Sequence, residues 1–154
     1  MAVAKLIRKH AALPAGATRL VVVADTHSHP HHDAYRLIAA QQPDAILHAG
    51  DIGELGVLDE LARIAPVFAI RGNIDTTAAE LPDVLVLDHP AVRMMIVHIG
   101  VYVPKLRAEV AARARAEGSR FGGCGHAHVP FIGLDRGIYV FNPGSIGPRR
   151  FQLP

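Results

Sequence analysis

The sequence predicts an α/β fold in a single domain with two packed sheets, and three observations predict it. Short apolar segments at residues 20–23, 45–49 and 67–70 alternate with helix-length segments at residues 33–41 and 56–64. Strands and helices that alternate over short connections form parallel sheets through right-handed crossovers. After residue 80 the pattern changes to consecutive strands joined by turns. No repeat, low-complexity tract or linker separates the two halves.

The first three strands are predicted to be buried on both faces. Residues 20–23 read Leu-Val-Val-Val and are followed almost at once by Asp25 and His27. A continuous apolar run of this length is typical of a strand inside a parallel sheet. The helices between the strands are expected to end before Pro43 and Pro66, because the residue before a proline disfavours helical backbone. Polar residues then gather at the carboxyl ends of the strands, where open α/β sheets bind ligands.

The second half is predicted to form a second sheet and one helix. Its expected strands are residues 84–87, 92–98, 120–124, 129–134 and 138–141. The first two flank a hairpin turn, and the last two pair across another. A helix is expected at residues 104–117, with Gly118 as its C-terminal stop.

The start of the chain differs from the rest. Residues 1–18 mix basic residues with alanines, which predicts a short helix or a frayed extension. We therefore expect an N-terminal extension at residues 1–19 and a single domain at residues 20–154. No long apolar segment follows the initial Met1, so neither a signal peptide nor a membrane span is predicted.

Composition narrows the class of protein. The chain has 154 residues, a formal net charge of +2 and one cysteine, Cys124, which cannot form an internal disulfide. A lone cysteine without a leader favours a reducing cytoplasm and no membrane partner. The small net charge argues against nucleic acid as a partner. Ten histidines are the unusual feature, since histidine is the commonest metal ligand.

Seven polar side chains share one property, because each lies where an apolar run ends. They are Asp25, His27, Asp51, Asn73, His98, His126 and His128. Taken singly, each has a structural explanation such as a turn, a helix cap or a buried histidine bonded to a carbonyl. Their joint occurrence at successive strand ends favours a metal site, because histidine and carboxylate are the nitrogen and oxygen ligands of divalent transition metals.

These residues carry a resemblance. The motifs Asp25-x-His27, Gly50-Asp51, Gly72-Asn73-x-Asp75, His98 and Gly125-His126-x-His128 resemble the ordered motif set of the calcineurin-like metallophosphoesterase superfamily. Their form, with the closing segment 142–145, is similar to the small YfcE-like phosphodiesterase branch. The resemblance implies a four-layer α/β/β/α sandwich with two mixed β-sheets.

The resemblance also implies a dinuclear metal centre. Asp51 would bridge two divalent ions, one also held by Asp25, His27 and His128, the other by Asn73, His98 and His126. Manganese is the first expectation, with nickel, iron or zinc as alternatives. The implied reaction is in-line attack of a metal-bridging hydroxide on a phosphodiester, with Asn73, Asp51 and His27 as catalytic residues. His48 and Asp75 would orient the ligands, and His29 is a further candidate for reaching the pocket and contacting the substrate.

Two positions depart from the family pattern. Larger relatives carry a histidine straight after the asparagine, proposed as a general acid, whereas this chain has Ile74, which cannot donate a proton. We therefore expect a preference for diesters or aryl esters with good leaving groups, unless His27, His29 or water supplies the proton. The small branch also shows His followed directly by Gly, whereas Ile99 separates His98 from Gly100 here. That insertion is expected to shift the backbone near the second ion.

Three functions are compatible with this reading. The leading one is a hydrolase acting on a small phosphoester substrate. The first alternative is a catalytically weak, protein-binding scaffold of the same fold, which predicts lost ligands. The second is a nuclease, suggested by a sequence pI near 9.0 but not supported by any aromatic and basic stripe. A homo-oligomer is expected only by analogy with relatives.

Overall fold

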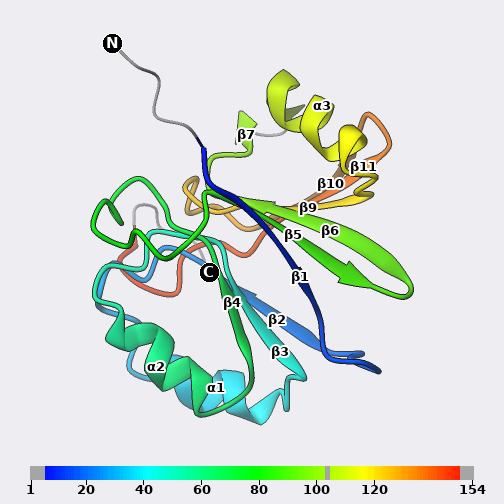
Figure 1. Cartoon of the computed structure of the whole chain (residues 1–154). Helices are drawn as coiled ribbons and strands as arrows, with labels where there is room; N and C mark the ends of the chain where they lie inside the picture. The colour runs from blue at the N-terminus through cyan, green and yellow to red at the C-terminus, as the bar shows by residue number, and fades with distance from the viewer. Residues whose placement is uncertain (1–5, 103–104, 150–154) are drawn as a thin grey trace.

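The structure is a computed structural model that describes residues 6–102 and 105–149. It has four layers (Figure 1), in which the helix α3 covers the outer face of a six-stranded sheet and the helices α1 and α2 cover the outer face of a three-stranded sheet. The helices are α1 (Ala34–Ala40), α2 (Gly56–Ala62) and α3 (Ala108–Ala116). The predicted α/β/β/α fold class is confirmed.

The two main sheets differ in topology. The smaller contains β2 (Leu20–Val23), β3 (Ala45–His48) and β4 (Val67–Ala69), and both of its strand pairs are parallel. The larger contains β1 (Arg8–Ala12), β5 (Val84–His89), β6 (Val92–Val97), β9 (Phe121–Gly123), β10 (Phe131–Asp135) and β11 (Ile138–Asn142), in the order β1-β5-β6-β9-β11-β10. It mixes parallel and antiparallel pairs. The prediction of two mixed sheets is therefore wrong for the smaller one, whose three described strands are linked through helices.

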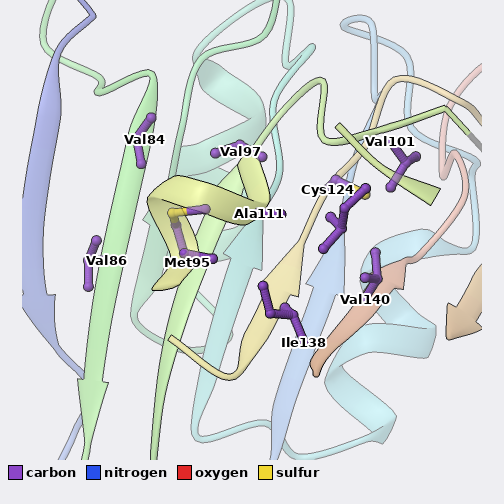
Figure 2. Packing of buried hydrophobic residues seen from close by; sticks show 11 residues of the cluster. Val84, Val86, Met95, Val97, Val101, Ala111, Cys124, Ile138 and Val140 are labelled. Carbon is purple, nitrogen blue, oxygen red and sulfur yellow. The ribbon is translucent and has the colours of Figure 1, made fainter. Parts of the chain in front are cut away.

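Apolar side chains of β5 and β6 point alternately to the two faces of the larger sheet, so the two strands contribute to two hydrophobic cores. Val84, Val86, Met95 and Val97 face α3, where they pack with Ala111 (Figure 2). The intervening residues face the smaller sheet, and they are Leu85, Leu87, Met94 and Ile96. Because successive side chains of a strand point to opposite faces, uninterrupted apolar strands are what a sheet covered on both faces requires.

The smaller sheet is sandwiched in the same way. Leu47 and Ala45 face the larger sheet, whereas Ile46 faces α1 and α2 with Ile38 and Leu61. Only β3 is buried along its whole length, although this was predicted for all three strands. The flanking strands β2 and β4 are mostly half-buried, because each pairs with a neighbour on one side only. The polar carboxyl-terminal residues of the three strands emerge together at one edge, which is where the candidate site lies.

The N-terminal segment corrects one expectation. Residues Arg8–Ala12 form neither a helix nor a frayed end, but the strand β1, which pairs in parallel with β5. Lys9 and His10 are exposed on it. An edge strand with exposed charged residues lacks the apolar pattern that identifies a strand, and charges there also discourage pairing with other chains.

The predicted helix at residues 104–117 begins later than expected. Residues 101–102 and 105–106 form a short antiparallel hairpin, β7 (Val101–Tyr102) and β8 (Lys105–Leu106), and α3 begins at Ala108. Pro104, the predicted start, lies outside the described residues. Gly118 adopts a φ of 68°, so its prediction as the C-terminal stop is confirmed. Within the described ranges, no helix has the length and apolar character needed to cross a membrane.

Candidate metal centre

Parallel pairing continues past the ends of β2 and β3 and sets two candidate carboxylates side by side. The backbone N–H of Asp25 donates to the carbonyl of Gly50 at 3.0 Å, and the N–H of His27 donates to the carbonyl of Asp51 at 3.0 Å. Asp25 and Asp51 are both fully buried. The two loops therefore place the carboxylates of Asp25 and Asp51 next to each other at the carboxyl ends of β2 and β3.

Most of the candidate ligands have an unusual backbone conformation. Five of the seven adopt positive φ, namely Asp25, His27, Asp51, His126 and His128. Left-handed backbone is uncommon in residues other than glycine and costs on the order of 1–3 kcal/mol each. Strain of this kind persists only where the surrounding structure imposes it, and it is typical of functional sites.

Two groups of potential metal ligands result. Asp25, His27 and His128 form one, and Asp51, His98 and His126 form the other; within each group the potential ligand atoms lie within 4.8 Å of one another. A third group, His31, His32 and Asp33, is largely exposed.

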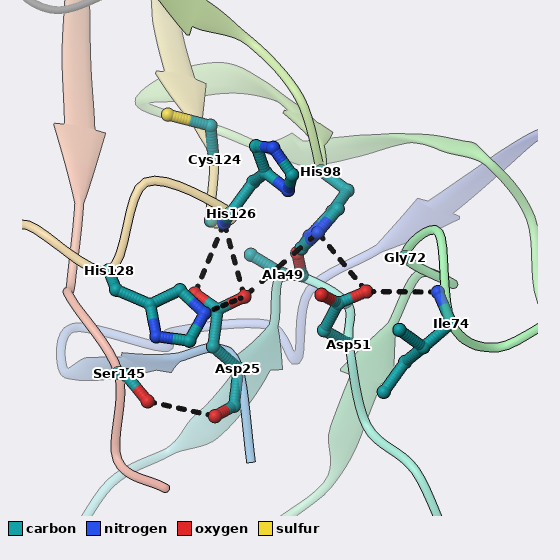
Figure 3. A network of polar contacts seen from close by, with 12 residues as sticks. Asp25, Ala49, Asp51, Gly72, Ile74, His98, Cys124, His126, His128 and Ser145 are labelled. Atoms are coloured by element: carbon teal, nitrogen blue, oxygen red, sulfur yellow. Dashed lines mark hydrogen bonds and ion pairs between the residues drawn. The ribbon is translucent and has the colours of Figure 1, made fainter. Parts of the chain in front are cut away.

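Asp51 contacts one histidine of each of the first two groups. Its Oδ1 is 3.2 Å from Nε2 of His98 in its own group (Figure 3), and its Oδ2 is 3.4 Å from Nε2 of His27 in the other group. Each carboxylate oxygen thus faces a histidine of a different group. This is the arrangement that a bridging carboxylate needs.

Asp25 connects the same groups from the other side. Its Oδ1 lies 3.4 Å from Nε2 of His128 and 3.9 Å from Nε2 of His98. Its two oxygens accept the backbone N–H of His126 at 3.2 and 3.1 Å. The loop after β9 is therefore fixed to the loop after β2 through a buried carboxylate.

The remaining predicted residues occupy different positions. Asn73 is exposed and lines a cavity together with His98. His29 is also exposed, and its Nδ1 lies 2.9 Å from the carbonyl of His27. His48 and Asp75 are buried beneath the loops that carry the candidate ligands.

The electrostatics of the centre favour an anionic Asp51. Burial raises the pKa of its carboxyl, but the adjacent His98, the backbone N–H of Ile74 and His27 outweigh burial and lower that pKa to about 2. Burial in turn lowers the pKa of His98, whereas Asp51, the carbonyl of Ala49 and Asp25 raise it, with a net rise. Asp51 therefore stays ionised at neutral pH.

The atoms at the centre fit divalent cations. Among the described residues, Nε2 of His27, Oδ2 of Asp51 and Nε2 of His98 are buried and make no hydrogen bond, and the contacts of the two histidines with Asp51 are ion pairs only when the imidazoles are protonated. Buried polar atoms are normally hydrogen-bonded, so such a cluster needs an explanation. Imidazole nitrogens with carboxylate oxygens are a donor set for transition metals. The residues present therefore fit a pair of such ions.

Comparison with known proteins identifies the family. A sequence profile of the calcineurin-like phosphoesterase superfamily domain matches residues 19–154. The chain belongs to the calcineurin-like phosphoesterase superfamily. This membership confirms the resemblance and implies divalent metal ions and hydrolysis of phosphoester bonds.

Individual relatives agree with this assignment. A probable metallophosphoesterase of Methanocaldococcus jannaschii is 32% identical over 137 residues, which are 84% of this chain and 69% of that protein. A structure of wild-type Vps29 from Entamoeba histolytica complexed with Zn²⁺ has a TM-score of 0.68 at 21% identity, covering 83% of this chain and 74% of that one. The structure of a novel archaeal phosphodiesterase has a TM-score of 0.66 at 21% identity, covering 83% and 84%.

A buried hydrogen-bond chain supports the centre of this phosphoesterase. Nδ1 of His48 accepts the N–H of Gly50 at 3.2 Å, and Nε2 of His48 lies 3.1 Å from Oγ1 of Thr26. The Thr26 hydroxyl donates to the carbonyl of Ile52 at 2.8 Å. Neutral His48 with its proton on Nε2 satisfies every one of these groups. Protonating Nδ1 would break the bond from Gly50.

The hydrogen-bond chain through His48 predicts that the folded protein loses stability in acid. Burial is the main cause that lowers the pKa of His48 from 6.5 to about 4. Between these values the unfolded chain binds a proton there that the folded chain does not, so stability is lost as pH falls. We expect wild type to lose about 3 kcal/mol more than His48→Gln between pH 7 and pH 4 in urea unfolding of metal-free protein. A difference that stays constant with pH would contradict the assignment.

Sequence analysis missed residues that hold the loops together. Asn142, buried at the end of β11, donates through Nδ2 to the carbonyl of Gly125 at 2.8 Å and accepts the N–H of Gly144 at 2.9 Å. The Ser145 hydroxyl donates to the carbonyl of Asp25 at 2.9 Å. The segment 142–145 closes the motif set in the sequence, but its bonds to the loops of Asp25 and His126 depend on contacts between residues distant in sequence.

Close backbone approach explains one glycine of the motif set. A Cβ on Gly72 would lie 2.1 Å from Oδ1 and 2.3 Å from the backbone N of Asp51. Only glycine lets the loop after β4 pass the Asp51 carboxylate at this distance. Position 72 must therefore be glycine for steric reasons, and the next residue, Asn73, is a candidate metal ligand.

Cys124 is not a nucleophile of this centre. It is buried, and burial raises the pKa of its thiol to about 12, so the reactive thiolate is not populated at neutral pH. Its side chain packs in the core beneath α3.

Proposed function

We propose that this protein is a dinuclear metal-dependent phosphodiesterase. The residues that would hold the ions are Asp25, His27 and His128 for one, Asn73, His98 and His126 for the other, and Asp51 for both. The observation that carries the proposal is the position of Asp51, whose two oxygens lie 3.4 and 3.2 Å from histidines of different groups. When bound, two divalent ions supply Lewis acidity and an activated water for in-line hydrolysis of phosphoesters.

The chain's own residues have separate tasks in this proposal. Asp51 contributes a negative charge that offsets the repulsion between two neighbouring cations, and its low pKa keeps that charge in place. Asn73 lies at the edge of the cavity beside His98, where its amide can donate a hydrogen bond to a phosphoryl oxygen. Three further candidate ligands each have a hydrogen-bonded backbone N–H group, so the loops that carry them need little reorganisation when substrate binds. These ligands are Asp25, His27 and His126.

A diester is favoured because of position 74. Ile74 is 41% exposed and its backbone N–H donates to Oδ1 of Asp51 at 3.2 Å. An apolar side chain at this place cannot protonate a leaving alkoxide. Substrates whose leaving group departs without that proton, such as aryl esters, should therefore react best.

Manganese is the ion that we propose first, with nickel, iron and zinc as alternatives. The candidate ligands are nitrogen and oxygen atoms, and no thiolate contributes, since Cys124 stays protonated. Such a donor set suits several transition metals and disfavours calcium, which takes oxygen ligands alone.

A direct test combines metal content with turnover. We expect two Mn²⁺ per chain by elemental analysis, manganese-dependent hydrolysis of bis-p-nitrophenyl phosphate, loss of turnover on chelation, and its return on adding Mn²⁺. Single- and double-stranded DNA should remain intact under the same conditions. Uptake of no more than one ion, or no turnover of any phosphoester at saturating metal, would favour the protein-binding scaffold instead.

A further inference from the structure

A cavity of about 360 Å³ opens beside the second ligand group. It lies where the ends of β4 and β6 meet the start of α3, and its described lining includes Gly72, Asn73 and His98. Because Asn73 and His98 are candidate ligands, the cavity borders the proposed metal centre on the side of the second ligand group. Its size is at the lower end of the range for small-molecule sites.

The walls of this cavity are mainly apolar. Val84 and Val97 line it from the larger sheet, Ile99 lines it from the segment after β6, and Val110 lines it from α3. Ile99 is the residue inserted between His98 and Gly100, and it is only partly buried. The departure from the family pattern therefore places an extra apolar side chain in the wall next to a candidate ligand.

Two carboxylates line the cavity, Asp83 and Glu109, and each is paired with an arginine. A guanidinium nitrogen of Arg107 lies 2.7 Å from a carboxylate oxygen of Glu109. The guanidinium of Arg71 donates to both oxygens of Asp83, at 2.7 and 3.0 Å, which neutralises that carboxylate. Arg113 also lines the cavity, and it makes no ion pair within the described part of the chain. A phosphodiester can thus enter beside a cationic group while its ester group meets hydrocarbon.

Building on the proposed function, we propose that this cavity binds the retained ester group of the substrate. The preferred substrates are then phosphodiesters that carry a bulky apolar group, and Ile99 and Val110 determine this specificity from two different elements of the fold. Neither side chain can take part in the chemistry. Their contribution is the burial of the substrate's apolar surface, which is approximately proportional to the area removed from water.

The test compares two substrates with one leaving group, phenyl p-nitrophenyl phosphate and methyl p-nitrophenyl phosphate. In Ile99→Ala and Val110→Ala we expect the phenyl-to-methyl ratio of kcat/KM to fall about tenfold, with turnover of the methyl ester retained. Val110 is the more stringent position, because it lies on a different element from every candidate ligand. Ile132→Ala, the same type of change at a position that is 75% exposed on β10, should leave the ratio unchanged.

Binding without metal gives a second measurement. Diphenyl phosphate added to metal-free protein should shift the methyl resonances of Val97, Ile99 and Val110, whereas dimethyl phosphate should not. If methyl p-nitrophenyl phosphate is hydrolysed but the ratio is insensitive to both variants, the cavity proposal is wrong and the proposed function stands. If neither ester is hydrolysed, the proposed function fails, and the methyl shifts alone decide whether the cavity binds apolar phosphodiesters.

Discussion

Asp51→Asn is expected to reduce turnover of bis-p-nitrophenyl phosphate by about a thousandfold or more. The substitution keeps the size of the side chain but removes the charge that faces His27 and His98 together. Without that charge, two cations would repel one another across a neutral amide. Loss of roughly 4 kcal/mol of transition-state stabilisation corresponds to this factor. Steady-state kinetics at saturating Mn²⁺ measure it, and elemental analysis should show fewer than two ions per chain.

The matched control is Asp59→Asn, the same change at an exposed position on α2. It should retain wild-type turnover and wild-type metal content. Two ions per chain and full turnover in Asp51→Asn would show that Asp51 is not the bridge. Unchanged metal content with low turnover would instead limit Asp51 to a role in substrate hydrolysis.

The order of most strands and helices could be predicted from hydrophobic patterning, whereas the four-layer arrangement was implied by the family resemblance. Strands such as Leu20–Val23 are apolar without interruption, and the hairpin between β5 and β6 has its turn at Pro90 and Ala91 as expected. These signals are local, because each depends on residues a few positions apart. The strand β1 carries no such signal, since it is recognisable only from its pairing with β5.

The sequence predicts which residues form the candidate site but not how their backbone and side chains are arranged. Parallel strands deliver their terminal residues to one edge, so Asp25 and Asp51 were expected to be neighbours. The positive φ of both residues was not expected, since aspartate does not reveal its backbone conformation in sequence. The hydrogen bonds from Asn142 and Ser145 also escape sequence reasoning, because they join segments more than ten residues apart.

Asp75 joins two of the loops at the centre through a single buried carboxylate. Its Oδ1 accepts the N–H of Ile52 at 3.0 Å and that of Gly53 at 3.0 Å, and its Oδ2 accepts the N–H of Gly72 at 2.7 Å. Ile52 and Gly53 follow Asp51, whereas Gly72 precedes Asn73. The carboxylate therefore fixes the two loops relative to each other from beneath, without facing the candidate ligands itself.

Asp75→Ala is accordingly expected to destabilise the metal-free protein by about 3–5 kcal/mol, because three N–H donors lose a charged acceptor in a buried place. Asp75→Asn should cost less, since its amide oxygen still accepts while its NH₂ group opposes the remaining donors. Urea unfolding of both variants without metal separates this effect from metal binding, and Asp59→Ala on exposed α2 should stay within about 0.5 kcal/mol of wild type. If Asp75→Ala were as stable as that control, the loops would have to be positioned by the strands alone. The loss of unfolding free energy should be largest for Asp75→Ala, smaller for Asp75→Asn and smallest for the control. This order distinguishes a carboxylate that joins the loops from one that is only buried.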